Sequence, residues 1–106
     1  MIVYNVTVSI DPAIENDWLE WMRSLHIPEV MATGCFKESR ILRVHGEEEG
    51  GLTYAITYVC SSQEIYDHYQ ATHAPKLQKD HNDKYGGRFA AFRTTLTLID
   101  EFKDER

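Results

Sequence analysis

Apolar and polar residues alternate along the first ten positions of the chain. One face of this segment would carry Ile2, Tyr4, Val6, Val8 and Ile10. The other face would carry Val3, Asn5, Thr7 and Ser9. A period of two over this length predicts a β-strand over residues 2–10, with its first face in the core.

The apolar residues that follow recur with the period of an α-helix, about 3.6 residues. Asp11 and Pro12 suit the N-cap and the first turn of this helix. Its apolar stripe would consist of Ile14, Trp18, Trp21, Met22 and Leu25. We expect the helix to end at Pro28, because proline lacks the amide proton of the helical ladder and restricts the residue before it.

Residues 36–44 and 52–59 predict two more strands, and the segment 45–51, rich in glycine and glutamate, predicts the turn between them. The strands would pair as an antiparallel hairpin that brings Cys35 close to Cys60. The two cysteines could form a disulfide. They could also be buried free thiols, which is the usual state inside the cell.

A second helix is predicted after the hairpin. Ser61 and Glu64 have the spacing of a capping box. The stripe that follows consists of Ile65, Tyr69 and His73. Pro75 should interrupt the helix, which would resume and stop before Gly86. A last strand would run from about residue 89 to residue 102.

The phrase His-x-Pro occurs twice, at residues 26–28 and 73–75, each time where a predicted helix stops. The element order is strand, helix, strand, strand, helix, strand, so each half of the chain carries one copy. Such a pseudo-repeat is typical of the ferredoxin-like β-α-β-β-α-β fold. We expect an α+β protein with a single domain over residues 1–106, in which both helices cover one face of a four-stranded antiparallel sheet.

The face of the sheet away from the helices would be small and mildly polar. Its side chains would be Asn5, Thr7, Ser9, Thr53, Ala55, Thr57, Thr95 and Thr97. This face could lie in water, or it could pack on a second copy of the chain. A chain of 106 residues buries only about two-thirds of its unfolded surface, so association would add stability. We therefore favour a homodimer whose sheets pack face to face.

Charge and hydropathy exclude several classes of partner. The chain has 17 acidic and 11 basic residues, a net charge of −6, which repels nucleic acids and anionic membranes. No segment approaches the ~18 consecutive apolar residues of a membrane span. The N-terminal segment lacks the basic start and the continuous apolar run of a signal peptide. We expect a cytoplasmic protein with no nucleic-acid or membrane partner.

The residues most suited to acid–base chemistry are the two repeated histidines. His73 would lie one turn after Tyr69 on the buried stripe, and a histidine with its reference pKa of ~6.5 can act as a base or an acid near neutral pH. His26 occupies the equivalent place in the first half. Each could instead be a core histidine that bonds a carbonyl at the end of its helix. Tyr69 would assist His73.

Two further residues are candidates for ligand binding. Trp18 is typical of a core, although a ligand pocket would use the same kind of side chain. Arg93, within the last strand, could bind an anionic ligand or form a salt bridge. The run Asp80, His81 and Asp83 matches no known metal spacing and is interpreted as a solvated helix face. No cofactor motif occurs, so we expect neither a metal nor a cofactor.

Two segments, HIPEVMATG (residues 26–34) and HAPKLQKDHNDKYGGRFAAFRT (residues 73–94), together with the element order, give the chain a resemblance to known proteins. It resembles the dimeric α/β-barrel superfamily, which includes antibiotic-biosynthesis monooxygenases, EthD-like proteins and stress-responsive barrel proteins. Nearly the whole chain is similar to an uncharacterised family of short bacterial domains. The resemblance implies a ferredoxin-like fold, sheets packed back to back across a two-fold axis, and no established activity.

The superfamily's sites lie in the cleft between the helices and the sheet. Similarity to EthD-like proteins, which carry His-x-Pro phrases near helix ends, implies roles for His26 and His73. Haem-degrading relatives use an asparagine on the first strand, a tryptophan and a histidine. Asn5 and His73 match the first and the last, but the tryptophan's place falls near His68 and Tyr69. Strand alternation would also turn Asn5 away from the helices.

Two functions fit these observations. The first is a small homodimeric protein that binds a small molecule in the helix–sheet cleft, as a metabolite sensor would. The second is a cofactor-independent enzyme of the monooxygenase or EthD-like type, with His73 as the acid or base. Neither the ligand nor a reaction follows from the residues.

Overall fold

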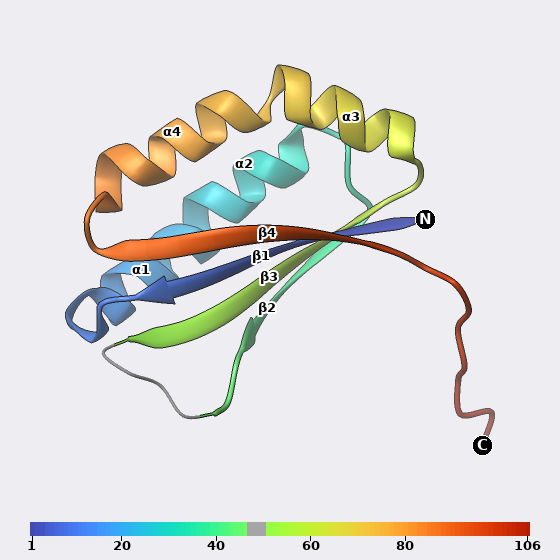
Figure 1. Cartoon of the computed structure of the whole chain (residues 1–106), viewed down its shortest axis with the longest axis horizontal. Helices are drawn as coiled ribbons and strands as arrows, with labels where there is room; N and C mark the ends of the chain where they lie inside the picture. The colour runs from blue at the N-terminus through green and yellow to red at the C-terminus, as the bar shows by residue number, and fades with distance from the viewer. Residues whose placement is uncertain (47–50) are drawn as a thin grey trace.

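The computed structural model describes residues 1–46 and 51–106 (Figure 1). Residues 47–50, which belong to the predicted hairpin turn, lie outside the described residues. In chain order the elements are β1 (Ile2–Ile10), the 3₁₀ turn η1 (Pro12–Ile14), α1 (Glu15–Trp21), the π-helical turn η2 (Met22–His26), α2 (Ile27–Ala32), β2 (Glu38–Arg43), β3 (Leu52–Cys60), α3 (Gln63–Thr72), α4 (Ala74–Tyr85) and β4 (Phe89–Thr97).

The four strands form one antiparallel sheet in the order β2-β3-β1-β4. All the helices lie on the same side of this sheet (Figure 1). The first helical arm (residues 12–32) follows β1, and the second helical arm (residues 63–85) follows β3. Each half of the chain therefore places one helical arm over the sheet. The predicted ferredoxin-like architecture is confirmed.

The core lies between the helices and the two central strands. From β1 and β3 it receives Ile2, Tyr4, Val8, Ile10, Tyr54, Ile56, Tyr58 and Cys60. Trp18 on α1 is completely buried against them, and its ring lies 5.1 Å from that of Tyr54. Burying one such large apolar side chain contributes roughly 1.5–3 kcal/mol, so this layer holds the helices on the sheet.

The first helical arm does not end at Pro28, as the sequence predicted. It continues through α2, and Pro28 lies in the first turn of that helix. The π-helical turn η2 comes directly before, where the Ile27 amide donates to the Met22 carbonyl five residues back. A wider turn of this kind accommodates a proline, whose ring would clash with a carbonyl of a regular α-helix. The turn also buries His26 and leaves Leu25 exposed, although Leu25 was predicted in the apolar stripe.

The second helical arm breaks at His73, as Pro75 predicted. Its cap, however, is Ser62 and not Ser61. Ser62 has the extended backbone of an N-cap, and its Oγ accepts a hydrogen bond from the Ile65 amide at 3.2 Å. This start leaves Ile65 exposed, so Tyr69 is the one member of the predicted stripe that is buried.

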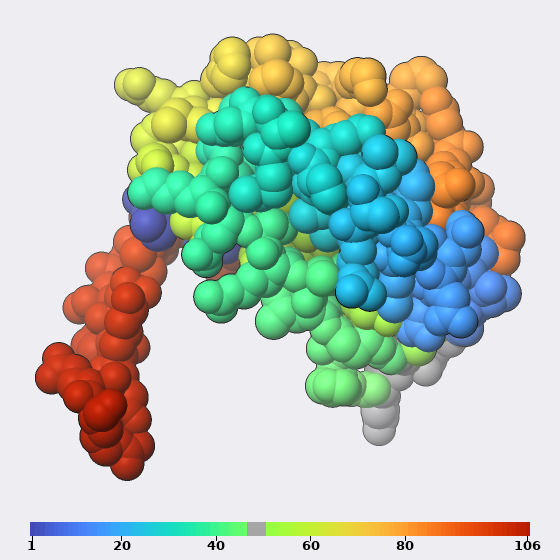
Figure 2. Space-filling model, turned by 180° about the vertical axis from the view of Figure 1, so that it is seen from behind, coloured from blue at the N-terminus to red at the C-terminus, as the bar shows by residue number. Residues whose placement is uncertain are grey.

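The last strand ends at Thr97, earlier than predicted. Thr97 pairs with Ile2, the first residue of β1, and one further backbone hydrogen bond, from the Leu98 amide to the Met1 carbonyl at 3.1 Å, follows this pair. The segment after it extends away from the body of the molecule (Figures 1 and 2). It exposes the side chains of Ile99 and Phe102.

The sheet face opposite the helices is more apolar than predicted. Paired residues of antiparallel strands point to the same face, and Asn5 pairs with Thr94 and Thr7 with Phe92. Thr94 therefore belongs to this open face, whereas Thr95 and Thr97, which pair with Tyr4 and Ile2, lie on the side of the helices. The open face exposes Phe92 (63%), Leu96 (49%) and Leu42 (46%).

Cys35 and Cys60 are both buried free thiols, so the disulfide is not formed. Within the described residues, no helix is long and apolar enough to cross a bilayer.

Candidate functional site

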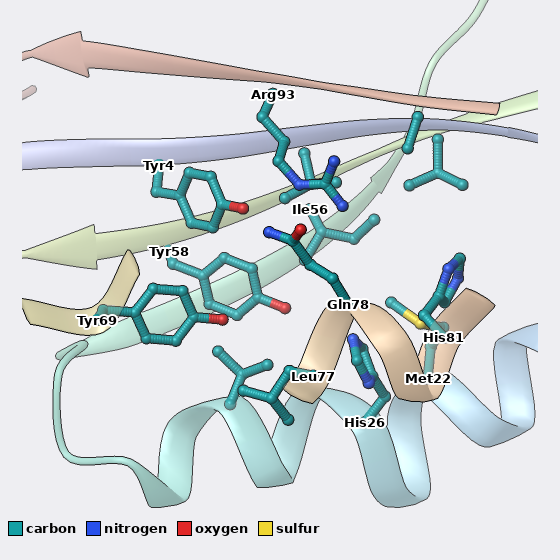
Figure 3. Close-up of a pocket in the computed structure, with 14 residues that line it drawn as sticks. Tyr4, Met22, His26, Ile56, Tyr58, Tyr69, Leu77, Gln78, His81 and Arg93 are labelled. Atoms are coloured by element: carbon teal, nitrogen blue, oxygen red, sulfur yellow. The ribbon is translucent and has the colours of Figure 1, made fainter. Parts of the chain in front are cut away.

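A pocket opens between the helical layer and the sheet (Figure 3). Its cavity has a volume of about 40 Å³. The strands supply one wall, with Tyr4, Val6 and Val8 from β1, Ile56 and Tyr58 from β3, and Ala91 and Arg93 from β4. The helices supply the other, with Met22, His26, Val30, Tyr69, Leu77, Gln78 and His81. Most of the lining is apolar, and a few polar groups reach into it, as is usual for small-molecule sites.

Three tyrosines form one end of the pocket. Tyr4 lies on β1, Tyr58 on β3 and Tyr69 on α3, and the Tyr4 ring centroid is 5.9 Å from that of Tyr58 and 6.0 Å from that of Tyr69. Their hydroxyl groups point in the same direction, into the pocket (Figure 3). Burial, and secondarily the neighbouring tyrosines, raises the pKa of the Tyr58 and Tyr69 hydroxyls well above its usual range. Both hydroxyls therefore stay protonated and can donate hydrogen bonds to a ligand.

His26 and His81 form the other end. They are 9% and 8% exposed, and their ring centroids lie 5.6 Å apart. The His26 ring stacks on Trp21 at 4.6 Å. The pKa of each histidine is lowered from 6.5 to about 4, mainly by burial. The nearby His26 and Arg93 contribute to the shift at His81, whereas Asp80 opposes the shift at His26. Both rings are therefore neutral at pH 7.

His81 is held by a hydrogen bond from the core. The Trp18 indole Nε1 donates to His81 Nε2 at 2.9 Å. An indole nitrogen is a donor alone, so His81 Nε2 must be the acceptor and the ring proton must lie on Nδ1. Trp18 itself does not line the pocket; it fixes the orientation and tautomer of a residue that does.

His26 has a buried polar atom that is not satisfied. Its Nδ1 has no hydrogen-bond partner among the residues that the structure describes. An unpaired buried polar atom costs about 1–3 kcal/mol. Such an atom in the wall of a cavity therefore needs an explanation, and a bound water or ligand is one.

Arg93 lies on the edge strand β4, where its side chain reaches towards the pocket beside Gln78 (Figure 3). Among the described residues that line the pocket, it alone carries a formal charge at pH 7. Its guanidinium group also favours the deprotonated forms of the Tyr69 hydroxyl and the His81 ring. The β4 wall of the pocket therefore carries a positive charge in a protein that is acidic overall.

Comparison with known proteins places the chain in a family. The profile of a family described as "Domain of unknown function (DUF4286)" matches residues 1–99. The chain belongs to this family. No curated protein has a significant match to the sequence.

Solved structures similar to this DUF4286 protein share its fold at low sequence identity. An EthD-family protein from Bacillus halodurans is 13% identical, with a TM-score of 0.63 over 89% of this chain and 97% of the other. A dimeric ferredoxin-like protein from an uncultured marine organism is 14% identical, with a TM-score of 0.66 over 98% and 100%. SnoaB from Streptomyces nogalater, a cofactor-independent oxygenase, is 9% identical, with a TM-score of 0.69 over 97% and 98%. The predicted resemblance to the dimeric α/β-barrel superfamily is thus confirmed for the fold.

The structure brings together some of the predicted site residues and separates others. His26, Tyr69 and Arg93 all line the pocket. Asn5 does not: it lies on the open face, where its Nδ2 donates to Thr7 Oγ1 at 3.0 Å, and this is the placement that strand alternation predicted. His73 also lies outside the lining, at the break between α3 and α4.

The pocket contains residues that the sequence analysis missed. His81 was interpreted as part of a solvated face, but it is buried while Asn82 and Asp83 beside it are exposed. The signal was present in the sequence, because Leu77, His81 and Tyr85 follow one another at helical spacing and all three are buried. Tyr4 and Tyr58 were assigned to strands without a role, and only the pairing of β1 with β3 places their hydroxyls together.

Proposed function

We propose that this protein binds a small molecule in the pocket between the helices and the sheet. The observation that carries the proposal is the convergence of the hydroxyl groups of Tyr4, Tyr58 and Tyr69 on one cavity, with Arg93 on the same lining (Figure 3). Polar groups directed into a cavity between apolar walls stabilise a ligand more than they stabilise the fold. The unpaired Nδ1 of His26 supports the same interpretation.

The polar groups also indicate the chemical class of the ligand. Protonated tyrosine hydroxyls donate hydrogen bonds, and a guanidinium group binds carboxylates and similar anions. Val6, Val8, Val30 and Ile56 add an aliphatic surface to the lining. A small molecule with an apolar part and an anionic oxygen group fits both features. The cavity of about 40 Å³ would hold the buried part of such a ligand, and the remainder would extend towards Arg93.

The geometry fits binding better than acid–base catalysis. His73, the predicted acid or base, is not among the residues that line the pocket. His26 is in the lining, but a histidine with a pKa of about 4 is a weak base, and general bases work best with a pKa near the working pH. The two histidines therefore suit a neutral, hydrogen-bonding wall more than proton abstraction.

A set of simple carboxylates tests the proposal. Acetate, butyrate and benzoate would be compared with the corresponding uncharged amides by the shift of the thermal unfolding midpoint. We expect the carboxylates to stabilise the protein more than the amides, because only the carboxylates carry the charge that the Arg93 guanidinium group binds. A bound ligand at about 100 times its Kd adds about 2.7 kcal/mol of stability. Arg93→Gln should remove this difference.

Arg23→Gln is the matched control, since Arg23 lies on η2, is exposed and does not line the pocket. It should leave the shift unchanged. If no carboxylate stabilises the protein, or if Arg93→Gln binds as the wild type does, the proposed ligand class is wrong.

The protein also forms a homodimer through the open face of its sheet. Two observations support this part of the proposal. Phe92, Leu96 and Leu42 expose apolar surface on a face that no helix covers, and exposed apolar patches of this kind often mark protein interfaces. The marine ferredoxin-like protein with the same fold is described as dimeric.

A further inference from the structure

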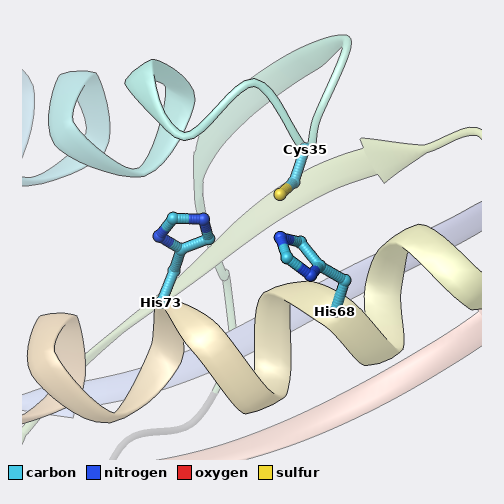
Figure 4. A group of neighbouring side chains, drawn as sticks. All are labelled: Cys35, His68 and His73. Carbon is cyan, nitrogen blue, oxygen red and sulfur yellow. The ribbon is translucent and has the colours of Figure 1, made fainter.

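A second cluster of chemically reactive side chains lies outside the pocket (Figure 4). Cys35 follows α2, His68 lies on α3, and His73 lies at the break between α3 and α4. The Cys35 sulfur and one ring nitrogen from each histidine all lie within 4.8 Å of one another. None of the three residues lines the pocket, so the cluster is a separate feature of the molecule.

We infer that Cys35, His68 and His73 bind a transition-metal ion, with Zn²⁺ as the expected occupant. A thiolate and two imidazoles are the ligand types that zinc prefers, whereas Mg²⁺ and Ca²⁺ prefer oxygen. In a tetrahedral site with Zn–S of about 2.3 Å and Zn–N of about 2.0 Å, the ligand atoms lie about 3.5 Å apart. The three atoms therefore need to approach one another by at most about 1.3 Å, which small side-chain rotations would provide.

The backbone explains why two histidines five residues apart can share one ion. On an unbroken α-helix their directions would differ by about 140°. Here the helix breaks at His73, whose φ is −112°, and Pro75 follows in the first turn of α4. The break turns His73 to the side of His68, and the ring centroids lie 5.7 Å apart. The second His-x-Pro phrase thus places a histidine beside another potential ligand.

The other two side chains are also held in place. Cys35 comes directly after Gly34, which has a φ of 76°, and the Cys35 amide donates to Thr33 Oγ1 at 3.3 Å. This turn directs the thiol towards the two histidines (Figure 4). His68 Nδ1 lies 3.4 Å from Thr72 Oγ1, a contact that leaves Nε2 for the metal. Metal-binding histidines are commonly oriented by such a second hydrogen bond.

The surroundings suit an exchangeable ion more than a purely structural one. Cys35 is buried, His73 is half-buried and His68 is exposed, so the site lies at the surface with one side open. Within the described residues, three side chains form the group, which leaves the fourth tetrahedral position for water or another small ligand. Sites with three protein ligands and one open position are the pattern of zinc ions that bind substrates.

Titration of the metal-free protein with ZnCl₂, followed by calorimetry, tests the inference. We expect one zinc ion per chain. Cys35→Ser should weaken binding by about tenfold or more, and His68→Gln should do the same. The matched controls are Cys60→Ala, which removes the other buried thiol, and His45→Gln, which removes an exposed histidine. Both controls should bind zinc as the wild type does.

Cobalt(II) gives an independent spectroscopic readout. A Co²⁺ ion bound by the three side chains should show the visible bands of tetrahedral geometry and a thiolate charge-transfer band that Cys35→Ser removes. His68 is exposed, so His68→Gln keeps the fold even if the buried cysteine variant unfolds. Failure of the wild type to bind zinc at one ion per chain, or equal binding by wild type and His68→Gln, would overturn the site.

Discussion

His26 and His81 show how burial decides the behaviour of single residues in this protein. Both side chains are polar, both lie in the wall of the pocket, and each has a pKa of about 4 instead of 6.5. Burial is the main cause of both shifts, but the hydrogen bonds of the two rings differ. His81 receives a hydrogen bond from Trp18, which orients the ring, whereas His26 has an unpaired Nδ1. A histidine therefore receives its hydrogen bond from the core at position 81, whereas at position 26 its Nδ1 is left for a ligand.

These two histidines should make the stability of the protein depend on pH. Each folded-state pKa lies below the unfolded value, so the unfolded chain binds more protons between about pH 4 and about pH 6.5. The stabilisation is complete above pH 6.5 and is lost as the pH falls towards 4. At about pH 5 the loss should be roughly 2 kcal/mol for each histidine. Urea unfolding at several pH values measures it.

The variant His26→Phe isolates one of the two contributions. Phenylalanine keeps the stacking on Trp21 and does not titrate, so the loss of stability between about pH 7 and about pH 5 should fall by about half. Near pH 7 the variant should be at least as stable as the wild type, because it removes an unpaired buried atom. His45→Gln, at an exposed position, should keep the wild-type profile. An unchanged profile in His26→Phe would contradict the argument.

At the scale of the elements, the two prolines of the repeated phrase have different effects. Pro28 follows a π-helical turn, and the helical arm continues through it to Ala32. Pro75 follows a break at His73, and a new helix begins. The identical spacing of the two phrases does not determine the outcome. The first arm accommodates the missing amide by widening one turn, and this widening buries His26 beside the pocket.

The N-cap of the second helical arm can be tested by single substitutions. Ser62 Oγ accepts a hydrogen bond from the Ile65 amide, so Ser62→Ala should lower the free energy of unfolding by about 1 kcal/mol. Ser61, next to it and exposed, makes the matched control: Ser61→Ala should change the stability by less than about 0.5 kcal/mol. Denaturant unfolding of both variants measures the difference. A larger loss of stability in Ser61→Ala than in Ser62→Ala would indicate that Ser61 is the N-cap, as the sequence suggested.

At the scale of the whole molecule, the sheet separates two surfaces with different roles. One face, under the helices, carries the core and the pocket. The other face is uncovered and exposes Phe92, Leu96 and Leu42. A short chain buries a limited share of its surface by itself, so burial of the open face against a second copy would add stability. A dimer through the open face would complete the burial without closing the pocket.

Two substitutions on β4 test the dimer. Phe92→Asp places a charge within the proposed interface and should convert the protein to a monomer. Thr95→Asp introduces the same charge on the same strand, but on the side of the helices, and should leave the dimer intact. Sedimentation velocity measures the mass of each. A wild-type protein that sediments as a monomer, or a Phe92→Asp variant that stays dimeric, would contradict the proposed interface.

Local patterns were enough to predict the fold and part of the site. Alternation over residues 2–10, the hairpin around residues 45–51 and the helical stripes gave the correct element order. His26, Tyr69 and Arg93 were also predicted candidates, and they line one pocket. Other details were wrong, among them the effect of Pro28, the cap at Ser62 and the end of β4. The sheet face of Thr95 and Thr97 and the burial of His81 were also wrong, because both depend on neighbours in space.

The sequence by itself determined which segments are strands and helices, since hydrophobic periodicity, prolines and capping residues act between near neighbours in the chain. The tertiary structure alone decided which side chains meet. The pairing of β1 with β3 and β4 brings Tyr4, Tyr58 and Arg93 to one pocket, and packing of α4 on α1 joins His81 to Trp18 across 63 positions. The cluster of Cys35, His68 and His73 arises in the same way. Contacts of this kind depend on the register of strands and the packing of helices, which no short window of sequence contains.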